Sequence, residues 1–150
     1  MTKGNARGWG ADLELEHLWQ NGIRLRASYS WSRLRYGDTG AKLENSPEHV
    51  AKLNLSAPLW EDRFRLGVDA QYIGDRVGRF GRNVAGFPVV NLTLTSDRML
   101  EHTMLKGLEV SASVYNLLDK NYAVAAGEEH RMNSIRQDGR NFRVLFTYRY

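Results

Sequence analysis

Asn141-Phe-Arg-Val-Leu-Phe-Thr-Tyr-Arg-Tyr150 is the stretch of the sequence that decides the fold. Alternate residues of this stretch are aromatic or aliphatic: Phe142, Val144, Phe146, Tyr148 and Tyr150. The residues between them are charged or hydroxylic, with Leu145 as the one apolar exception. Because side chains alternate between the two faces of a strand, the pattern predicts a strand with one apolar face and one polar face. A lipid-facing strand of an outer-membrane barrel has this pattern. The alternative is an amphipathic strand of a soluble sandwich.

Composition excludes several classes of protein. The chain has 150 residues, of which 42% are hydrophobic and 25% are charged, so it is not a disordered chain. No apolar run approaches the ~18–20 residues that a spanning helix needs. The mean hydropathy of -0.51 still allows a membrane barrel, because only alternate residues of a barrel strand face lipid. Cysteine is absent, which excludes a disulfide framework and a thiolate metal site.

The net charge of +4 suits three kinds of partner: nucleic acid, acidic lipid or an anionic ligand. Residues 1–7 contain cations but no apolar core, so they are not predicted to form a signal peptide. If the protein is exported, we expect its leader to lie elsewhere, or this chain to be a fragment.

Seven segments alternate in this way and predict an antiparallel meander without a helix. They are residues 8–19, 23–33, 49–59, 64–72, 87–95, 107–116 and 141–150. Asn21-Gly22 predicts a tight hairpin turn in which both residues adopt positive φ. Long polar loops are expected at 36–47, 74–86 and 117–140, after every second strand. Outer-membrane barrels alternate short and long connections in this way, so the pattern favours a transmembrane barrel over a soluble sandwich.

Four stretches resemble the late strands of TonB-dependent outer-membrane receptors. They are Asn45-Ser-Pro-Glu-His-Val-Ala-Lys-Leu-Asn-Leu55, Tyr72-Ile-Gly-Asp-Arg76, the run from Gly107 to Tyr122 that contains Val-Tyr-Asn-Leu-Leu-Asp-Lys-Asn-Tyr, and the run from Gln137 to Tyr150. The resemblance implies a barrel of about twenty-two strands around an N-terminal plug. It also implies import of ferric siderophores, cobalamin or other scarce nutrients, with energy passed on by TonB.

By this resemblance, residues 1–150 are the C-terminal portion of such a barrel, and they include neither the plug nor the segment that contacts TonB. Seven strands would be incomplete on their own, because each unpaired backbone group at an open edge costs several kcal/mol in lipid. We therefore expect that further strands of the same polypeptide close the edges, that copies associate, or that these residues fold poorly on their own.

Arg76, Arg79 and Arg82 are the candidate ligand-binding residues. They recur at every third position of the loop at 74–86, with Phe80 among them. Guanidinium groups bind carboxylates and phosphates well, so the loop predicts a basic patch for an anionic ligand or for lipopolysaccharide phosphates. The alternative is a solvated loop without a ligand.

No catalytic constellation is present, so we do not expect an enzyme, and no cofactor is expected. Glu128-Glu129-His130 supplies oxygen and nitrogen donors but no second fixed pair of ligands, and loop polarity explains it better than a metal site. The aromatic residues near strand ends are predicted to form interfacial girdles. They are Trp9, Trp19, Trp31, Trp60, Phe64, Tyr72 and Phe87. The polar positions expected to line the lumen are Arg24, Arg26, Lys52, Asn54, Arg65, Asp69, Gln71 and Glu109.

The sequence thus predicts part of a TonB-dependent receptor in the outer membrane of a Gram-negative bacterium, with a ferric siderophore or similar nutrient as ligand. Its expected partners are outer-membrane lipid and lipopolysaccharide, and TonB and the plug through the missing N-terminal part. One alternative is a small structural or porin-like barrel without TonB-coupled transport. A second is a soluble basic β-domain that binds nucleic acid. It ranks last because such domains interleave aromatics with cations on one face, whereas here the two occupy opposite faces, so no nucleic acid is expected.

Overall fold

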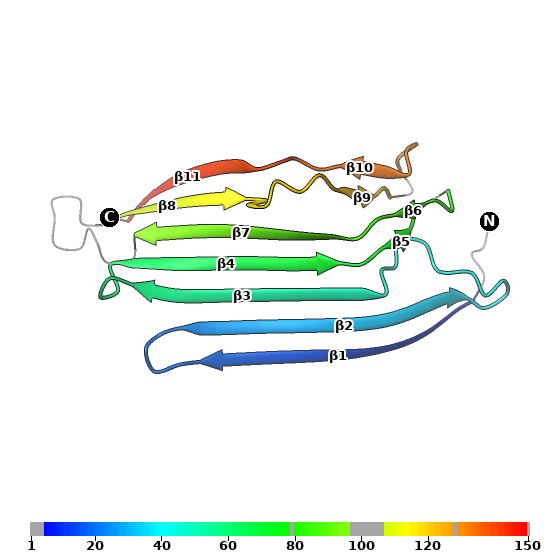
Figure 1. Cartoon of the computed structure of the whole chain (residues 1–150), viewed down its shortest axis with the longest axis horizontal. Helices are drawn as coiled ribbons and strands as arrows, with labels where there is room; N and C mark the ends of the chain where they lie inside the picture. Colours follow the sequence, from blue (N-terminus) through cyan, green and yellow to red (C-terminus); the bar gives the residue numbers. More distant parts are fainter. Residues whose placement is uncertain (1–4, 79, 97–106, 128, 150) are drawn as a thin grey trace.

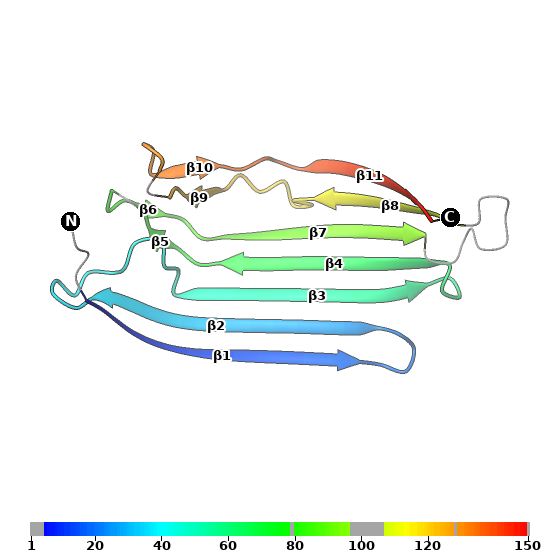
Figure 2. The ribbon, with the colours of Figure 1, turned by 180° about the vertical axis from the view of Figure 1, so that it is seen from behind.

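The computed structural model describes residues 5–78, 80–96, 107–127 and 129–149. Seven antiparallel strands form one open sheet in the order β1-β2-β3-β4-β7-β8-β11 (Figures 1 and 2). Their bounds are β1 Ala6–Leu18, β2 Arg24–Tyr36, β3 His49–Leu59, β4 Phe64–Ile73, β7 Phe87–Ser96, β8 Leu108–Tyr115 and β11 Asn141–Tyr148. This confirms the all-β meander of seven strands that is not closed on its own. Tyr150 lies outside the described residues.

The pairing register places like residues side by side across the sheet. Leu25 pairs with Leu55, which pairs with Val68, which pairs with Leu92. At the last two strands Val114 pairs with Phe142. Directly paired residues point to the same face, so the alternate apolar residues of all seven strands merge into one apolar face. We call this the outer face and the opposite, polar one the inner face.

None of the described residues forms a second layer on the outer face. Phe142, Val144 and Phe146 are exposed by 72%, 58% and 67%. The buried hydrophobic residues among those described are Val84, Phe87, Val89 and Ala126, which lie near one end of the sheet rather than between two layers. A soluble sandwich would bury its apolar face against a second sheet. The bare outer face is instead what a surface in contact with lipid requires.

Within the described ranges, no helix is both long and apolar enough to cross a membrane.

The turn between β1 and β2 differs from the predicted form. The Gly22 N–H donates to the Trp19 carbonyl at 3.0 Å, and the Trp19 N–H donates to the Ile23 carbonyl at 2.9 Å. Gly22 has a φ of 78°, whereas Asn21 is not among the described residues with positive φ. The loop is therefore the three-residue kind that ends in a glycine bulge, not the two-residue kind with two positive φ angles. A single glycine is enough to reverse the chain here.

Two of the three long connections contain small hairpins that the sequence did not predict. β5 (Arg76–Val77) pairs with β6 (Asn83–Val84), and β9 (Ala123–Ala125) pairs with β10 (Ser134–Arg136). Strands of two or three residues are too short to show an alternating pattern. Both hairpins lie at the same end of the sheet, beyond the ends of β4 and β8 (Figure 1).

Candidate functional site

The long connections come together at one end of the sheet in a unit that we call the loop cap, formed by the described parts of 37–48, 74–86 and 117–140. The Asn45 N–H donates to the Val77 carbonyl at 2.8 Å, which joins the first of these loops to β5. The Phe80 N–H donates to Asn133 Oδ1 at 3.3 Å, and the Ala126 N–H donates to the Asn133 carbonyl at 3.1 Å. The first two bonds connect the three loops to one another, and the third lies within the last loop.

An apolar cluster fastens the loop cap to the sheet. Phe87, at the start of β7, is 2% exposed, and its ring centroid lies 4.3 Å from that of Tyr122. Phe87 pairs with Ile73 and shares the face of Asn91, so it points inward. The sequence assigned Phe87 to an outer aromatic girdle. That assignment is wrong because the loop cap covers Phe87 on the inner face.

Arg76 is part of this buried cluster and not of an exposed patch. It is 7% exposed, and its Cζ lies 5.8 Å from the centroid of the Phe87 ring. Its Nε is buried and has no hydrogen-bond acceptor among the described residues. Burial lowers the pKa of the Arg76 guanidinium from its ordinary value, because removal of water disfavours the charged form.

The other two arginines of the predicted patch do not share this setting. Arg82 is exposed in the turn between β5 and β6, where its carbonyl accepts a hydrogen bond of 2.8 Å from the Gly78 N–H. Arg79 lies outside the described residues. The spacing of three residues therefore does not place Arg76 and Arg82 in one environment, since the short strand β5 turns Arg76 inward under the cap.

A cleft of about 520 Å³ opens between β6, β9 and β10. Two cations that the sequence did not single out line it, Lys120 and Arg136, together with the Tyr122 ring. Arg136 Nη2 donates to Asn121 Oδ1 at 2.9 Å, which fixes the guanidinium at the wall. Among the described residues no carboxylate lines the cleft, and those that do line it offer cations, amides and an aromatic surface to a ligand with negative or carbonyl oxygens. No sequence spacing pointed to it, because its walls come from segments distant along the chain.

A polar ladder crosses the inner face below the cap. Asn54 of β3 and Asn91 of β7 both donate side-chain N–H groups to the Asp69 carboxylate of β4, the second at 3.2 Å. Asp69 pairs directly with each of them in the strand register. Asn54 and Asp69 were expected to line the lumen, and the structure places them side by side on the inner face.

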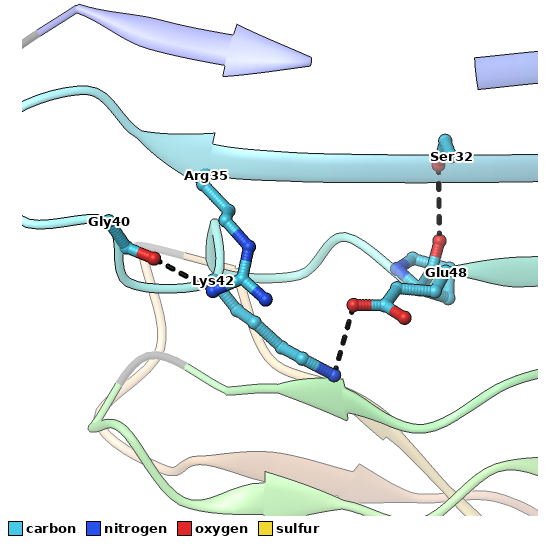
Figure 3. Close-up of polar contacts among 6 residues, drawn as sticks. Ser32, Arg35, Gly40, Lys42 and Glu48 are labelled. Carbon is cyan, nitrogen blue, oxygen red and sulfur yellow. Dashed lines mark hydrogen bonds and ion pairs between the residues drawn. The ribbon is translucent and has the colours of Figure 1, made fainter. Parts of the chain in front are cut away.

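The first long loop is held by an ion pair at its end (Figure 3). Lys42 Nζ lies 3.1 Å from Glu48 Oε1, and Arg35 Nη1 donates to the Gly40 carbonyl at 2.8 Å. The hydrogen bond from Lys42 lowers the pKa of the Glu48 carboxyl from its ordinary value, and the charges of Lys42, Arg33 and Arg35 act in the same direction. The pair closes the loop that leads into β3.

The acidic segment of the third loop shows no metal centre in the part of the chain that the structure describes. Glu129 Oε1 lies 3.3 Å from His130 Nε2, whereas Glu128 is outside the described residues. No group of three or more His, Asp or Glu side chains suited to a metal ion occurs among the residues described.

An open, one-layer antiparallel sheet with an apolar outer face, a polar inner face and long loops at one end defines a segment of an outer-membrane barrel. The family model described as TonB dependent receptor-like, beta-barrel, matches residues 2–117. The chain belongs to this family, whose members are receptors of the Gram-negative outer membrane, and the outer membrane is its location.

One curated relative and several solved structures resemble the chain. The vitamin B12 transporter BtuB of Vibrio vulnificus (strain YJ016) is 25% identical over 142 residues, which are 92% of this chain and 21% of the transporter. The ferripyoverdine receptor of the Pseudomonas aeruginosa outer membrane superposes with a TM-score of 0.73 at 19% identity, over 95% of this chain and 19% of the receptor.

The ferric-catecholate import receptor Fiu of Escherichia coli K12, in its closed form, superposes with a TM-score of 0.74 at 19% identity, over 94% of this chain and 20% of that receptor. The likeness to the two solved structures shows the shared fold. The chain thus spans about a fifth of the length of the relatives it matches.

Proposed function

We propose that these residues form about a third of the wall of a larger barrel that imports a ferric siderophore or a similar scarce nutrient with energy from TonB. The observation that carries the proposal is the open two-faced sheet. The outer edges of β1 and β11 have no neighbouring strand in the sheet, and in lipid such edges need partners. Further strands of the same polypeptide would supply these partners, as they do in the curated relative, which is more than four times as long as this chain.

The ligand is proposed to bind at the loop end. The residues that the sequence indicated are Arg76, Arg79 and Arg82, and the cleft adds Lys120, Tyr122 and Arg136. Two observations support this choice. The Arg76 Nε has no acceptor among the described residues, and a buried guanidinium gains most from an oxygen partner. The cleft joins cations to an aromatic ring, which suits a chelate with anionic and aromatic groups.

The relatives narrow the ligand class without naming one ligand. Their names refer to vitamin B12, ferripyoverdine and ferric catecholates. TonB and a plug are proposed as partners through the rest of the polypeptide, and lipopolysaccharide as a partner in the membrane.

Uptake in cells with and without TonB tests the proposal. Cells that make the full polypeptide containing these residues would receive radiolabelled ferric siderophores of several classes and radiolabelled cobalamin. We expect one class to bind to the cells in both strains and to accumulate only in the strain with TonB. Equal accumulation in both strains would instead support the porin-like barrel, and no binding of any member would contradict a receptor for these nutrients.

Substitutions then test the ligand contacts. Exchange of Arg76, Arg79 and Arg82 for Ser together is expected to weaken ligand binding by about tenfold or more, because each lost charge-assisted bond contributes about 1.5–3 kcal/mol. The control is Arg24→Ser with Arg63→Ser, two cations at the opposite end of the sheet. Unchanged affinity in the triple variant would refute the arginine contacts while leaving TonB-dependent uptake by this receptor intact.

A further inference from the structure

Three arginines stand on the outer face at the loop end of the first hairpin. In the register of β1 and β2, Arg7 pairs with Arg35 and Trp9 pairs with Arg33. The same register pairs Leu13 with Tyr29, so the three arginines share the face that carries the apolar residues. This set is separate from the arginines of the loop cap.

A cationic cluster on a lipid-facing surface needs a physical reason. Like charges directly opposite in neighbouring strands destabilise a sheet, and Arg7 and Arg35 are such a pair. Arg on a lipid face is costly at the membrane midplane and costs little near the interface. Trp9 pairs with Arg33, and Trp31 lies two residues before Arg33 on the same strand face. Tryptophan is enriched at the membrane–water interface. The cluster thus belongs at headgroup level, where anions are available.

The arginines line a common groove of about 390 Å³. Its walls are Arg7, Trp9, Arg33, Arg35, Tyr36, Gly37 and Gly40, and none of them carries a negative charge. Arg35 donates one N–H to the Gly40 carbonyl, whereas the neighbouring acid Glu48 is hydrogen-bonded to Lys42. Among the described residues no carboxylate lines the groove that the three guanidinium groups share. Glu48, whose pKa the charges of Arg33 and Arg35 help to lower, is paired with Lys42 and is not part of the lining.

We propose that this groove binds the phosphorylated headgroup of the outer-leaflet glycolipid, lipopolysaccharide. Guanidinium forks match phosphate oxygens, so Arg7, Arg33 and Arg35 would hold the phosphates at the top of the outer face. Trp9, which is 78% exposed, lies beside them on the same face and would rest at the boundary between sugar and acyl chain. A lipid is favoured over a soluble anion because the groove faces outward, away from the inner face that a transported ligand would pass.

The site rests on the lipopolysaccharide contact proposed above and not on the transported ligand, so the lipid site and the nutrient receptor can fail separately. The test uses the full polypeptide that contains these residues, purified in detergent, and measures binding of lipid A by native mass spectrometry. The variant is R7Q/R33Q/R35Q, and the matched control is R24Q/K52Q/R143Q, which removes three cations from the inner face.

We expect the outer-face variant to bind lipid A about tenfold or more weakly than the unmodified protein, and the inner-face control to bind it normally. Dephosphorylated lipid A should bind the unmodified protein as weakly as lipid A binds the outer-face variant. Equal lipid A binding by both variants would overturn the proposal, as would equal binding of the dephosphorylated lipid. Displacement of lipid A by inorganic phosphate at an equal concentration would assign the groove to a free anion instead.

A second variant keeps the test independent of folding. Arg33→Gln changes a single exposed residue and is expected to preserve the β-sheet signal in circular dichroism while weakening lipid A binding. Arg33→Lys keeps the charge but loses the bidentate fork, so its affinity should fall between those of Arg and Gln. Identical affinity for Arg, Lys and Gln at this position would contradict a phosphate contact by Arg33.

Discussion

The backbone N–H of Asn116 donates a hydrogen bond of 2.9 Å to the side-chain oxygen of Asn91, which joins the end of β8 to the middle of β7. The Asn116 side chain, 3% exposed, continues the network: Nδ2 donates to the carbonyls of Lys120 at 3.0 Å and Asp138 at 3.3 Å, and Oδ1 accepts from the Lys120 N–H at 2.9 Å. With the ladder through Asp69, one set of hydrogen bonds runs from β3 to the segment that leads into β11.

Asn116→Ala is therefore expected to lower the free energy of unfolding by about 3 kcal/mol. The substitution removes the side-chain partner of the part-buried backbone groups of Lys120 and Asp138. It also places alanine, whose side chain makes no compensating hydrogen bond, at a φ of 49°. Urea unfolding of the protein folded into lipid vesicles measures the loss. Asn116→Gly should lose less, because glycine tolerates that φ. Asn141→Ala, an exposed position, should change stability by less than about 0.5 kcal/mol, and an equal loss at both positions would contradict the role of Asn116.

Much of the fold could be predicted because a barrel strand shows its two faces in alternate residues. The strand His49–Leu59 has the predicted bounds, and the other six differ by no more than a few residues at each end. The turn at Asn21-Gly22 was located correctly but its geometry was not, since an Asn-Gly pair suits more than one kind of loop.

The candidate site was harder to predict than the sheet. The burial of Arg76 against Phe87 and the cleft residues Lys120 and Arg136 depend on how three separate loops pack. Local sequence patterns carry no information on such long-range packing. Asn116 entered the sequence analysis only within the stretch that resembles the receptors. Its hydrogen bonds to Asn91, Lys120 and Asp138 could not be predicted, because they produce no periodic pattern in the sequence.

Val144 and Leu145 of the last strand allow the effect of lipid contact to be measured apart from the effect of exposure. Val144 lies on the outer face and Leu145 on the inner face, and both are about half exposed, at 58% and 47%. Val144→Arg should cost about 2–4 kcal/mol in a bilayer, whereas Leu145→Arg should cost less than about 1 kcal/mol. Folding titrations into vesicles measure both. Equal costs at the two positions would show that β11 does not face lipid.

Gly86 allows a close approach of backbone to backbone at the start of β7. An added Cβ would lie 2.8 Å from the Ile73 carbonyl oxygen and equally close to backbone atoms of Gly74 and Asp75. Because backbone atoms cannot rotate away, Gly86→Ala is expected to cost about 1–3 kcal/mol. Gly67→Ala is the control, since its Cβ would meet nothing closer than 3.7 Å and alanine suits a strand better than glycine. A tolerated Gly86→Ala would contradict the tight contact.

The turn between β3 and β4 holds three consecutive residues in the left-handed region, Trp60, Glu61 and Asp62, with φ of 48°, 53° and 65°. Each such residue costs about 1 kcal/mol relative to glycine. Asp62→Gly is therefore expected to raise the free energy of unfolding by about 0.5–1 kcal/mol. Asp62→Ala removes the same carboxylate but keeps the Cβ, so it should give no gain. A gain of equal size from alanine would trace the effect to charge rather than to backbone conformation.

The Lys42–Glu48 pair gives the loop before β3 a dependence on pH (Figure 3). The hydrogen bond from Lys42 lowers the pKa of Glu48 in the folded state below its ordinary value of 4.5. A lowered carboxyl pKa means that the pair stabilises the fold in full above pH 4.5 and that this contribution is lost as the pH falls through the lowered pKa. Both side chains are partly exposed, so the effect is small and salt weakens it.

Glu48→Gln should therefore unfold more easily than the unmodified protein at neutral pH, with the difference shrinking in acid below pH 4.5. Lys42→Gln should remove the same pH dependence, because it takes away the partner that lowers the pKa. Unfolding curves of the two variants, the double variant and the unmodified protein, recorded at several pH values and at low and high salt, measure the coupling between the two residues. A difference that grows as the pH falls would have the wrong sign for a carboxylate stabilised in its charged form, and the pair would then not be the cause.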